Sequence, residues 1–231
     1  MDDSSNANAE VQEKGAEGKR SGESKRKNGG RTHHVRKAVR IAILVIGAAL
    51  AVIVITGLVM LVRWVVLSNQ ASSENAAILE LVEAQMPSTA SLPTWDPDSG
   101  PLTAVDVNGE SFVGVLEIPW SNSKLPVKAA WVDGDLSPGV YSGTPSHNDL
   151  VIGGPNLNGV FGGIETIPDK QAISFTDMEN RTYNFFVVAA ETLPASELDT
   201  VDDDPSDWDL TLFCSSPSGT QIEILRLAST F

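Results

Sequence analysis

The chain has 231 residues, a mass of 24.6 kDa, a formal net charge of −14 and 42% hydrophobic residues. These values exclude a collagen-like or wholly disordered chain, and they leave room for one ordinary domain with a membrane segment and tails. The single cysteine, Cys214, excludes an internal disulfide and a cysteine-rich zinc site.

The charge is distributed unevenly along the chain. Residues 1–40 hold ten Lys or Arg against six Asp or Glu, whereas residues 68–231 hold five against twenty-four, a net charge of −19. Such a negative domain repels phosphate backbones, so no nucleic-acid partner is expected. We interpret residues 1–40 as a disordered basic cytoplasmic tail, because residues 1–35 contain almost no apolar residues.

Residues 41–62 form a run of 22 residues without a charge. At 1.5 Å per residue this run crosses a hydrocarbon core of roughly 30 Å, and we predict a transmembrane helix within residues 41–67 rather than a buried core helix. Arg36, Lys37 and Arg40 precede the run and only Arg63 follows it closely. This asymmetry predicts a single-pass cell-membrane protein whose C-terminal part is extracellular.

Residues 68–103 are expected to join the membrane to the domain. Apolar residues at helical spacing predict a short juxtamembrane helix, with Ser73 as its N-cap and Pro87 at its end. The Pro-rich residues 87–103 are typical of a stiff spacer, or stalk.

Residues 104–231 alternate short β-prone stretches with clusters of Gly, Pro, Asn and Asp, which predicts an all-β barrel or sandwich. The predicted strands are residues 111–118, 125–132, 149–154, 172–177, 182–193, 209–214 and 221–228. Residues 176–183 are predicted to form a hairpin connection, and residues 196–208 a loop or short helix. In that loop the acids Asp202, Asp203, Asp204 and Asp207 lack EF-hand spacing, which favours a solvated loop over a Ca²⁺ site.

Three parts of this domain, taken in order, resemble the sortases, the membrane-anchored cysteine transpeptidases of mainly Gram-positive bacteria. They are FVGVLEIPWSNSKLPV from Phe112, LVIGGPNLNGVFGGIETI from Leu150, and WDLTLFCSSPSG from Trp208 followed by QIEILRLAS. The resemblance implies an eight-stranded β-barrel over residues 104–231, preceded by the transmembrane helix and the juxtamembrane helix.

The resemblance also implies a reaction and three residues that perform it. In sortases a Cys thiolate attacks a sorting motif near the C-terminus of a secreted protein, and a cell-wall or pilin amine then releases the acyl-enzyme. A His protonates the leaving amine, and an Arg donates to the substrate carbonyl or the oxyanion.

This chain departs from that pattern at the His position. Alignment on VIGGPNLNGVFGG places Pro155 where the family carries its His. His147 lies in the turn before the same strand and is expected at the strand's opposite end. Asn156 can hydrogen-bond a substrate but is no acid near neutral pH.

The Cys and Arg positions depart as well. Alignment on WDLTLFCSS places Ser215 at the nucleophile position and Cys214 one residue before it, so Cys214 either faces away from the groove as a small buried hydrophobe or is returned to it by a bulge. Gln221 or Ile222 stands at the usual Arg position, and Arg226 takes that place only with a longer loop. Cys214 and Arg226 are therefore the candidate catalytic residues.

Three functions are compatible with these residues. The first is a catalytically degenerate, sortase-like surface protein that binds sorting-signal peptides, pilins or sortases. The second is a divergent active transpeptidase that uses Cys214, and the third is an acidic display domain without a groove. No nucleotide, flavin or metal motif is visible, so no cofactor is expected.

Overall fold

The computed structural model describes residues 31–93, 100–202 and 208–230. The chain divides into two compact units, Met1–Val54 and Ile55–Phe231. The predicted disordered tail falls mostly on residues 1–30, which lie outside the described residues. Residues 31–40, the rest of that tail, are helical.

The N-terminal part of the described chain is one α-helix, α1 (Arg31–Glu83). From Ala42 onward it is long and apolar enough to cross a membrane, as predicted. The juxtamembrane helix is not a separate element, because no Gly or Pro interrupts the chain between Leu67 and Glu83. The prediction of Ser73 as an N-cap was wrong: Ser73 lies inside α1, and its hydroxyl donates to the Gln70 carbonyl at 2.9 Å.

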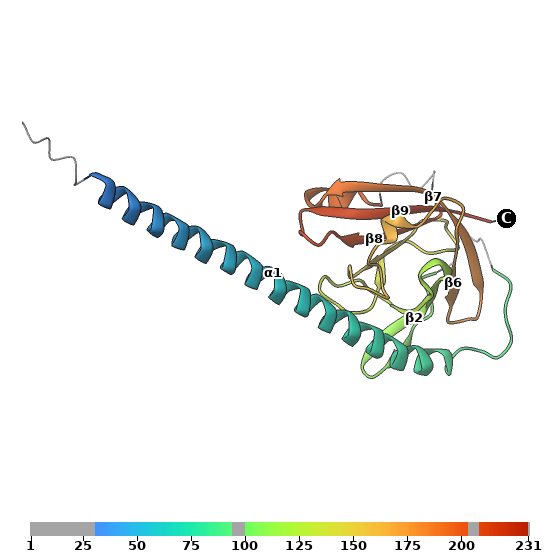
Figure 1. The fold of residues 1–231 in the computed structure, drawn as a ribbon. Helices are drawn as coiled ribbons and strands as arrows, with labels where there is room; N and C mark the ends of the chain where they lie inside the picture. The colour runs from blue at the N-terminus through green and yellow to red at the C-terminus, as the bar shows by residue number, and fades with distance from the viewer. Residues whose placement is uncertain (1–30, 94–99, 203–207, 231) are drawn as a thin grey trace, which may run out of the picture. The chain divides into compact units, whose positions relative to one another are not determined.

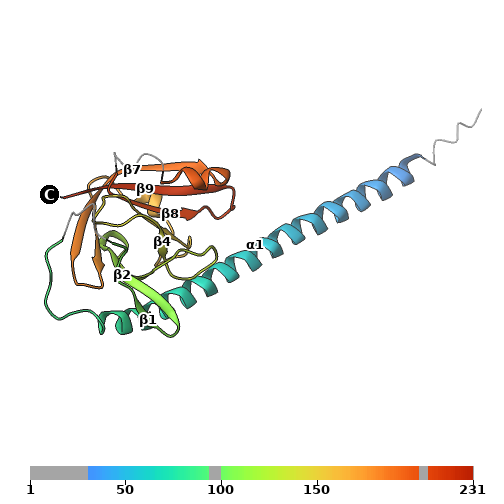
Figure 2. The ribbon, with the colours of Figure 1, turned by 180° about the vertical axis from the view of Figure 1, so that it is seen from behind.

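The last turns of α1 pack directly against the β-domain. Ala71, Ile78 and Val82 are buried there, and Figure 2 shows β1 (Val105–Val107) beside these turns. Asn75 adds a polar anchor, since its Nδ2 donates to the Leu136 carbonyl at 3.0 Å. Residues 68–83 therefore belong to the same compact unit as the domain.

The rest of the described chain is built of strands joined by turns and three short 3₁₀ helices (Figure 1). After β1 the strands are β2 (Glu110–Ile118), β3 (Ser123–Lys128), β4 (Gly139–Ser142), β5 (Leu150–Gly154), β6 (Ala172–Asp177), β7 (Thr182–Pro194), β8 (Leu210–Ser215) and β9 (Gln221–Ser229). The 3₁₀ helices are η1 (Pro119–Ser121), η2 (Ile164–Thr166) and η3 (Ala195–Thr200).

The strands close into a barrel. Their order is β1-β2-β3-β4-β5-β8-β9-β7-β6, and an additional pairing of β2 with β6 joins the two ends of the eight strands from β2 to β9. Only the β3–β4 and β5–β8 pairings are parallel. The eight-stranded barrel that the sortase resemblance implied is therefore confirmed, with β1 added at the edge of β2.

All seven strands predicted from the sequence are present, as is the hairpin that joins β6 to β7. The shortest strands, β1 and β4, were not predicted from the sequence. In β4 only four residues separate Pro138 from Gly143, and a single residue pair, Lys128 with Gly139, joins it to β3. Such short strands depend on their neighbours in the barrel rather than on a periodic pattern of their own.

A single hydrophobic cluster fills the barrel interior, with residues from both early and late strands, among them Leu116, Ile152, Leu212 and Leu225. The connection between β5 and β6 adds Phe161 and other apolar side chains to the same cluster. This connection begins directly after β5, next to the end of β8, and so positions the site described below.

Candidate functional site

The candidate site lies where β5 and β8 end. These strands are parallel neighbours in continuous register, and Gly154 is paired with Cys214. A side chain at Gly154 would come within 2.6 Å of the Phe161 ring, so only glycine lets the connection fold back over the end of the strand. The register shows no shift between β8 and its neighbours, and therefore no bulge moves Cys214.

The Cys214 side chain points into the barrel interior and is 0% exposed. Its Sγ atom lies 3.5 Å from the Phe161 carbonyl oxygen and 3.6 Å from Oε2 of Glu223, both of which are hydrogen-bond acceptors. Burial raises the pKa of this thiol strongly, and the negative charge of Glu223 raises it further. The surroundings therefore disfavour the thiolate, which is the form of cysteine that acts as a nucleophile.

Glu223 is the cross-strand partner of Cys214 on β9. Its Oε2 accepts a hydrogen bond from Nδ2 of Asn156 at 2.9 Å, and its carboxyl group lies within hydrogen-bonding reach of Glu165 from η2. Burial raises the pKa of Glu223, and the nearby Glu165 charge adds to this. The groups that interact with one another at the site are thus a thiol, an amide and two acids.

Pro155 and Asn156 directly follow β5, where the family pattern requires a His. The Pro155 carbonyl accepts from the Leu157 and Phe161 amides, so this residue shapes the start of the connection. His147 is exposed in the turn before Leu150, at the opposite end of β5. In the described part of the site, then, no imidazole accompanies the thiol.

The motif alignment assigns Ser215 to the nucleophile position and Gln221 or Ile222 to the arginine position. Ser215 and Ile222 are cross-strand partners on β8 and β9. Ser215 is exposed, and Ile222 is buried in a cluster outside the barrel.

Arg226 lies on the opposite face of the sheet from Cys214. It pairs with Thr211, and its guanidinium donates to Glu191 at 2.6 Å, to the Val201 carbonyl at 2.7 Å and to the Thr211 hydroxyl at 3.0 Å. The Trp208 ring lies 5.9 Å away. The structure therefore does not bring the two candidate catalytic residues together. Arg226 instead links β7 and β8 to the connection between them.

Aromatic rings cover the outer face of β5 and β8. Trp131, Tyr141 and Phe213 contact one another edge to face, with centroid distances of 5.4–5.8 Å. Gly153 makes room for them, since a side chain there would meet the Phe213 and Trp131 rings. Leu198 of η3 packs against the same cluster. Ser215 lies on this same face of β8. The protein's own side chains cover the face.

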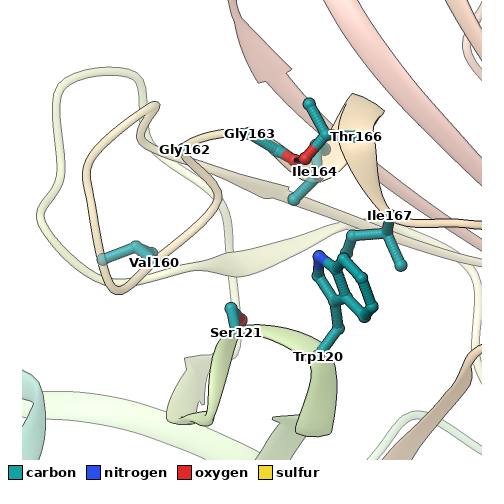
Figure 3. Close-up of a pocket in the computed structure, with 8 residues that line it drawn as sticks. All are labelled: Trp120, Ser121, Val160, Gly162, Gly163, Ile164, Thr166 and Ile167. Atoms are coloured by element: carbon teal, nitrogen blue, oxygen red, sulfur yellow. Dashed lines mark hydrogen bonds between the residues drawn. The ribbon is translucent and has the colours of Figure 1, made fainter.

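A separate small hollow of about 110 Å³ lies between η1 and the β5–β6 connection. Figure 3 shows the Trp120 indole beside Ile167, with the backbone of Gly162 and Gly163 on the far side. Trp120 is 54% exposed, which is unusual for so large an apolar ring. The hollow therefore offers an aromatic surface next to accessible backbone.

The acids of the site were missed by the sequence analysis. Glu223 lies in the segment QIEILRLAS, where alternation alone places it on the face of Leu225, but only the β8–β9 register places it beside Cys214. Glu165 is one of twenty-four acids after residue 67 and carries no local signal. No cluster of three or more metal-ligating side chains occurs among the described residues. Of the predicted acidic loop, Asp203, Asp204 and Asp207 lie outside them.

The solved structures to which this chain is similar include several sortases. The chain is similar to sortase A from Corynebacterium diphtheriae (19% identity, 73% of this chain and 93% of that one, TM-score 0.45). It is also similar to sortase C1 from Streptococcus agalactiae (22% identity, 55% and 71%, TM-score 0.43) and to a sortase D5 transpeptidase from Clostridium perfringens (12% identity, 71% and 99%, TM-score 0.46).

No family model and no curated protein matches the chain.

Proposed function

We propose that this chain is a membrane-anchored, sortase-like barrel that does not catalyse cysteine transpeptidation and acts at the cell surface by binding. The observation that carries the proposal is the contact between Cys214 and Glu223. A cysteine nucleophile needs a positively charged or imidazole neighbour that stabilises its thiolate. Here the neighbour is a carboxyl group, and the sulfur is buried.

The other family positions support the same conclusion. By the motif alignment, Pro155 stands at the position of the general acid, Ser215 at that of the nucleophile, and Gln221 or Ile222 at that of the arginine. Loss of a general acid alone costs roughly 10²–10⁴ in rate, and loss of the nucleophile removes the covalent route. With all three positions changed, we expect no turnover of a sorting motif.

Binding remains available to such a barrel, and the hollow at Trp120 is its proposed site. An exposed indole beside glycine backbone provides apolar contact and hydrogen-bonding groups for an extended peptide. The proposed ligands are a sorting-signal peptide, a pilin or an active sortase. The apolar part of α1 is proposed to anchor the barrel on the extracellular side, because the basic residues Arg36, Lys37 and Arg40 precede it.

A sorting-peptide assay on the full chain in lipid nanodiscs tests the loss of catalysis. We expect no cleavage of a fluorogenic sorting peptide by the chain or by its Cys214→Ala variant. Cleavage that Cys214→Ala abolishes would support the alternative, a divergent active transpeptidase, and would overturn the proposal.

Binding is tested separately by titrating an uncleavable sorting peptide. We expect saturable binding that Trp120→Ala weakens and that Trp208→Phe, a change at a Trp on the β7–β8 connection, leaves unchanged. Binding that is equally strong in both variants would exclude the Trp120 hollow as the site.

A further inference from the structure

The membrane-proximal turns of α1 lie against the same barrel end as the candidate site. Trp64 Nε1 lies 3.4 Å from the Asn156 carbonyl oxygen, and the Asn158 amide donates to the Ser68 hydroxyl at 3.2 Å. Together with the contacts of Asn75, these bonds fix the helix from Trp64 onward against the barrel. The end of the uncharged run therefore lies at a defined place beside the β5–β6 and β8–β9 connections.

A hollow of about 690 Å³ opens between this part of α1 and the barrel end. Its apolar lining comes from Met60, Leu61 and Leu67 on the helix and from Pro217 in the β8–β9 turn. Met60 is 70% exposed and Leu61 59% exposed. Apolar side chains on both sides of an open hollow favour an apolar occupant over water.

The hollow also contains one positive charge. Arg63 lines it, and its guanidinium group makes no hydrogen bond or ion pair with the residues that the structure describes. Residues 68–231 carry a net charge of −19 and repel anions. At this end of the barrel, the positive charge of Arg63 attracts an anionic group. The occupant that fits is apolar along most of its length and carries a negative group at one end.

The hollow lies at the end of the uncharged run, so the surrounding membrane can supply such a molecule. The uncharged run ends at Val62, directly before Arg63, so in a membrane-spanning α1 these residues lie at the level of the lipid headgroups. Trp64, next to Arg63, is a residue type enriched at that level. A phospholipid of the surrounding leaflet reaches this place without leaving the membrane.

We propose that the hollow between Met60–Leu67 and Pro217 binds a membrane phospholipid, with its phosphate at Arg63 and an acyl chain against the apolar lining. The bound lipid then holds the β5–β6 and β8–β9 connections at the membrane surface. This inference rests on the proposed membrane anchor, and co-elution of the full chain with nanodiscs tests that anchor separately.

The first experiment measures lipid proximity in nanodiscs of phosphatidylcholine and phosphatidylglycerol. Pro217→Cys in the full chain is labelled with a fluorophore and quenched by a lipid that carries a nitroxide near its headgroup. The matched control is Glu117→Cys, which lies beside Glu83 at the other end of the packed helix. We expect several-fold stronger quenching at position 217, and equal quenching at the two positions would overturn the proposal. The parent chain, in which Cys214 is buried, corrects for background labelling.

The second experiment separates a lipid in the hollow from a barrel that merely lies near the membrane. Leu67→Asp places a charge in the hollow, whereas Val188→Asp places one on the partly exposed β7. We expect Leu67→Asp to remove most of the quenching at position 217 and Val188→Asp to leave it unchanged. Quenching that persists in Leu67→Asp would overturn the binding of an acyl chain there.

The third experiment tests the headgroup and does not depend on the folding of the Asp variants. Lipid that co-purifies with the parent chain and with Arg63→Gln is measured by mass spectrometry. We expect the ratio of phosphatidylglycerol to phosphatidylcholine to fall several-fold in Arg63→Gln. An unchanged ratio would exclude Arg63 as the phosphate-binding residue.

Discussion

Cys214 Sγ and Glu223 Oε2 lie 3.6 Å apart on neighbouring strands, so the one thiol of this chain faces a carboxyl group inside the barrel rim. The carboxyl group accepts a hydrogen bond from the thiol, and a negative charge on either group disfavours a negative charge on the other. This relationship differs from the thiolate-stabilising surroundings of a catalytic cysteine.

The first prediction concerns thiol reactivity. Because Cys214 is buried and its pKa is raised, iodoacetamide at neutral pH should leave it unmodified in the folded chain and modify it fully in urea. Ser215→Cys in a Cys214→Ala background moves the thiol by one residue to an exposed position and should restore rapid alkylation. Mass spectrometry measures the modification, and rapid alkylation of Cys214 in the folded chain would contradict the description of its site.

The second prediction concerns pH. The folded-state pKa of Glu223 is raised above its ordinary value of 4.5, so the folded chain holds this proton more tightly than the unfolded chain. The stabilisation from this group is complete below pH 4.5 and is lost as the pH rises through the folded-state pKa. We expect Glu223→Gln to reduce this loss of unfolding free energy, as measured by urea titrations from acidic to neutral pH. Parallel pH profiles for the two proteins would show that Glu223 is not the group responsible.

The third prediction concerns Arg226. Its replacement by Ala leaves the Val201 carbonyl and the Thr211 hydroxyl without their donor in a buried position, and we expect a loss of about 3 kcal/mol in unfolding free energy. Lys124→Ala is the control, because it breaks an exposed ion pair with Glu83 and should cost at most about 1 kcal/mol. Similar losses in the two variants would argue against a structural role for Arg226 in the β7–β8 connection.

The fourth prediction concerns the attachment of α1. Asn75 is buried; its Nδ2 donates to the Leu136 carbonyl and its Oδ1 accepts from the Ser137 hydroxyl at 2.6 Å. Asn75→Ala leaves both partners unsatisfied, and we expect a loss of about 2 kcal/mol. Glu74→Ala, at the exposed neighbouring position, should change the stability little. Urea unfolding of both variants measures the difference, and an unchanged Asn75→Ala midpoint would contradict this role.

Much of this protein was predictable from the sequence because its signals are local. The uncharged run up to Val62 requires no partner to be recognised, and the strands with strong β-prone patterns, such as residues 172–177, were located to the residue. The alignment of short motifs also predicts the departures at Pro155 and Ser215, and these stay predictions. The absence of a helix break between Leu67 and Glu83 was also in the sequence, but the periodic pattern after Ser73 suggested a new helix.

The tertiary structure alone decided which residues meet. Glu223 is nine residues from Cys214 in the chain and Glu165 is farther still, yet the β8–β9 register and the fold of the β5–β6 connection place both acids at the thiol's end of the barrel. The alternation within one strand predicts which neighbours share a face with Cys214 or with Arg226. It does not predict that Cys214 and Arg226 lie on opposite faces of the sheet. That relation depends on the register between strands, which is set by packing across the whole barrel and not by the residues of either strand.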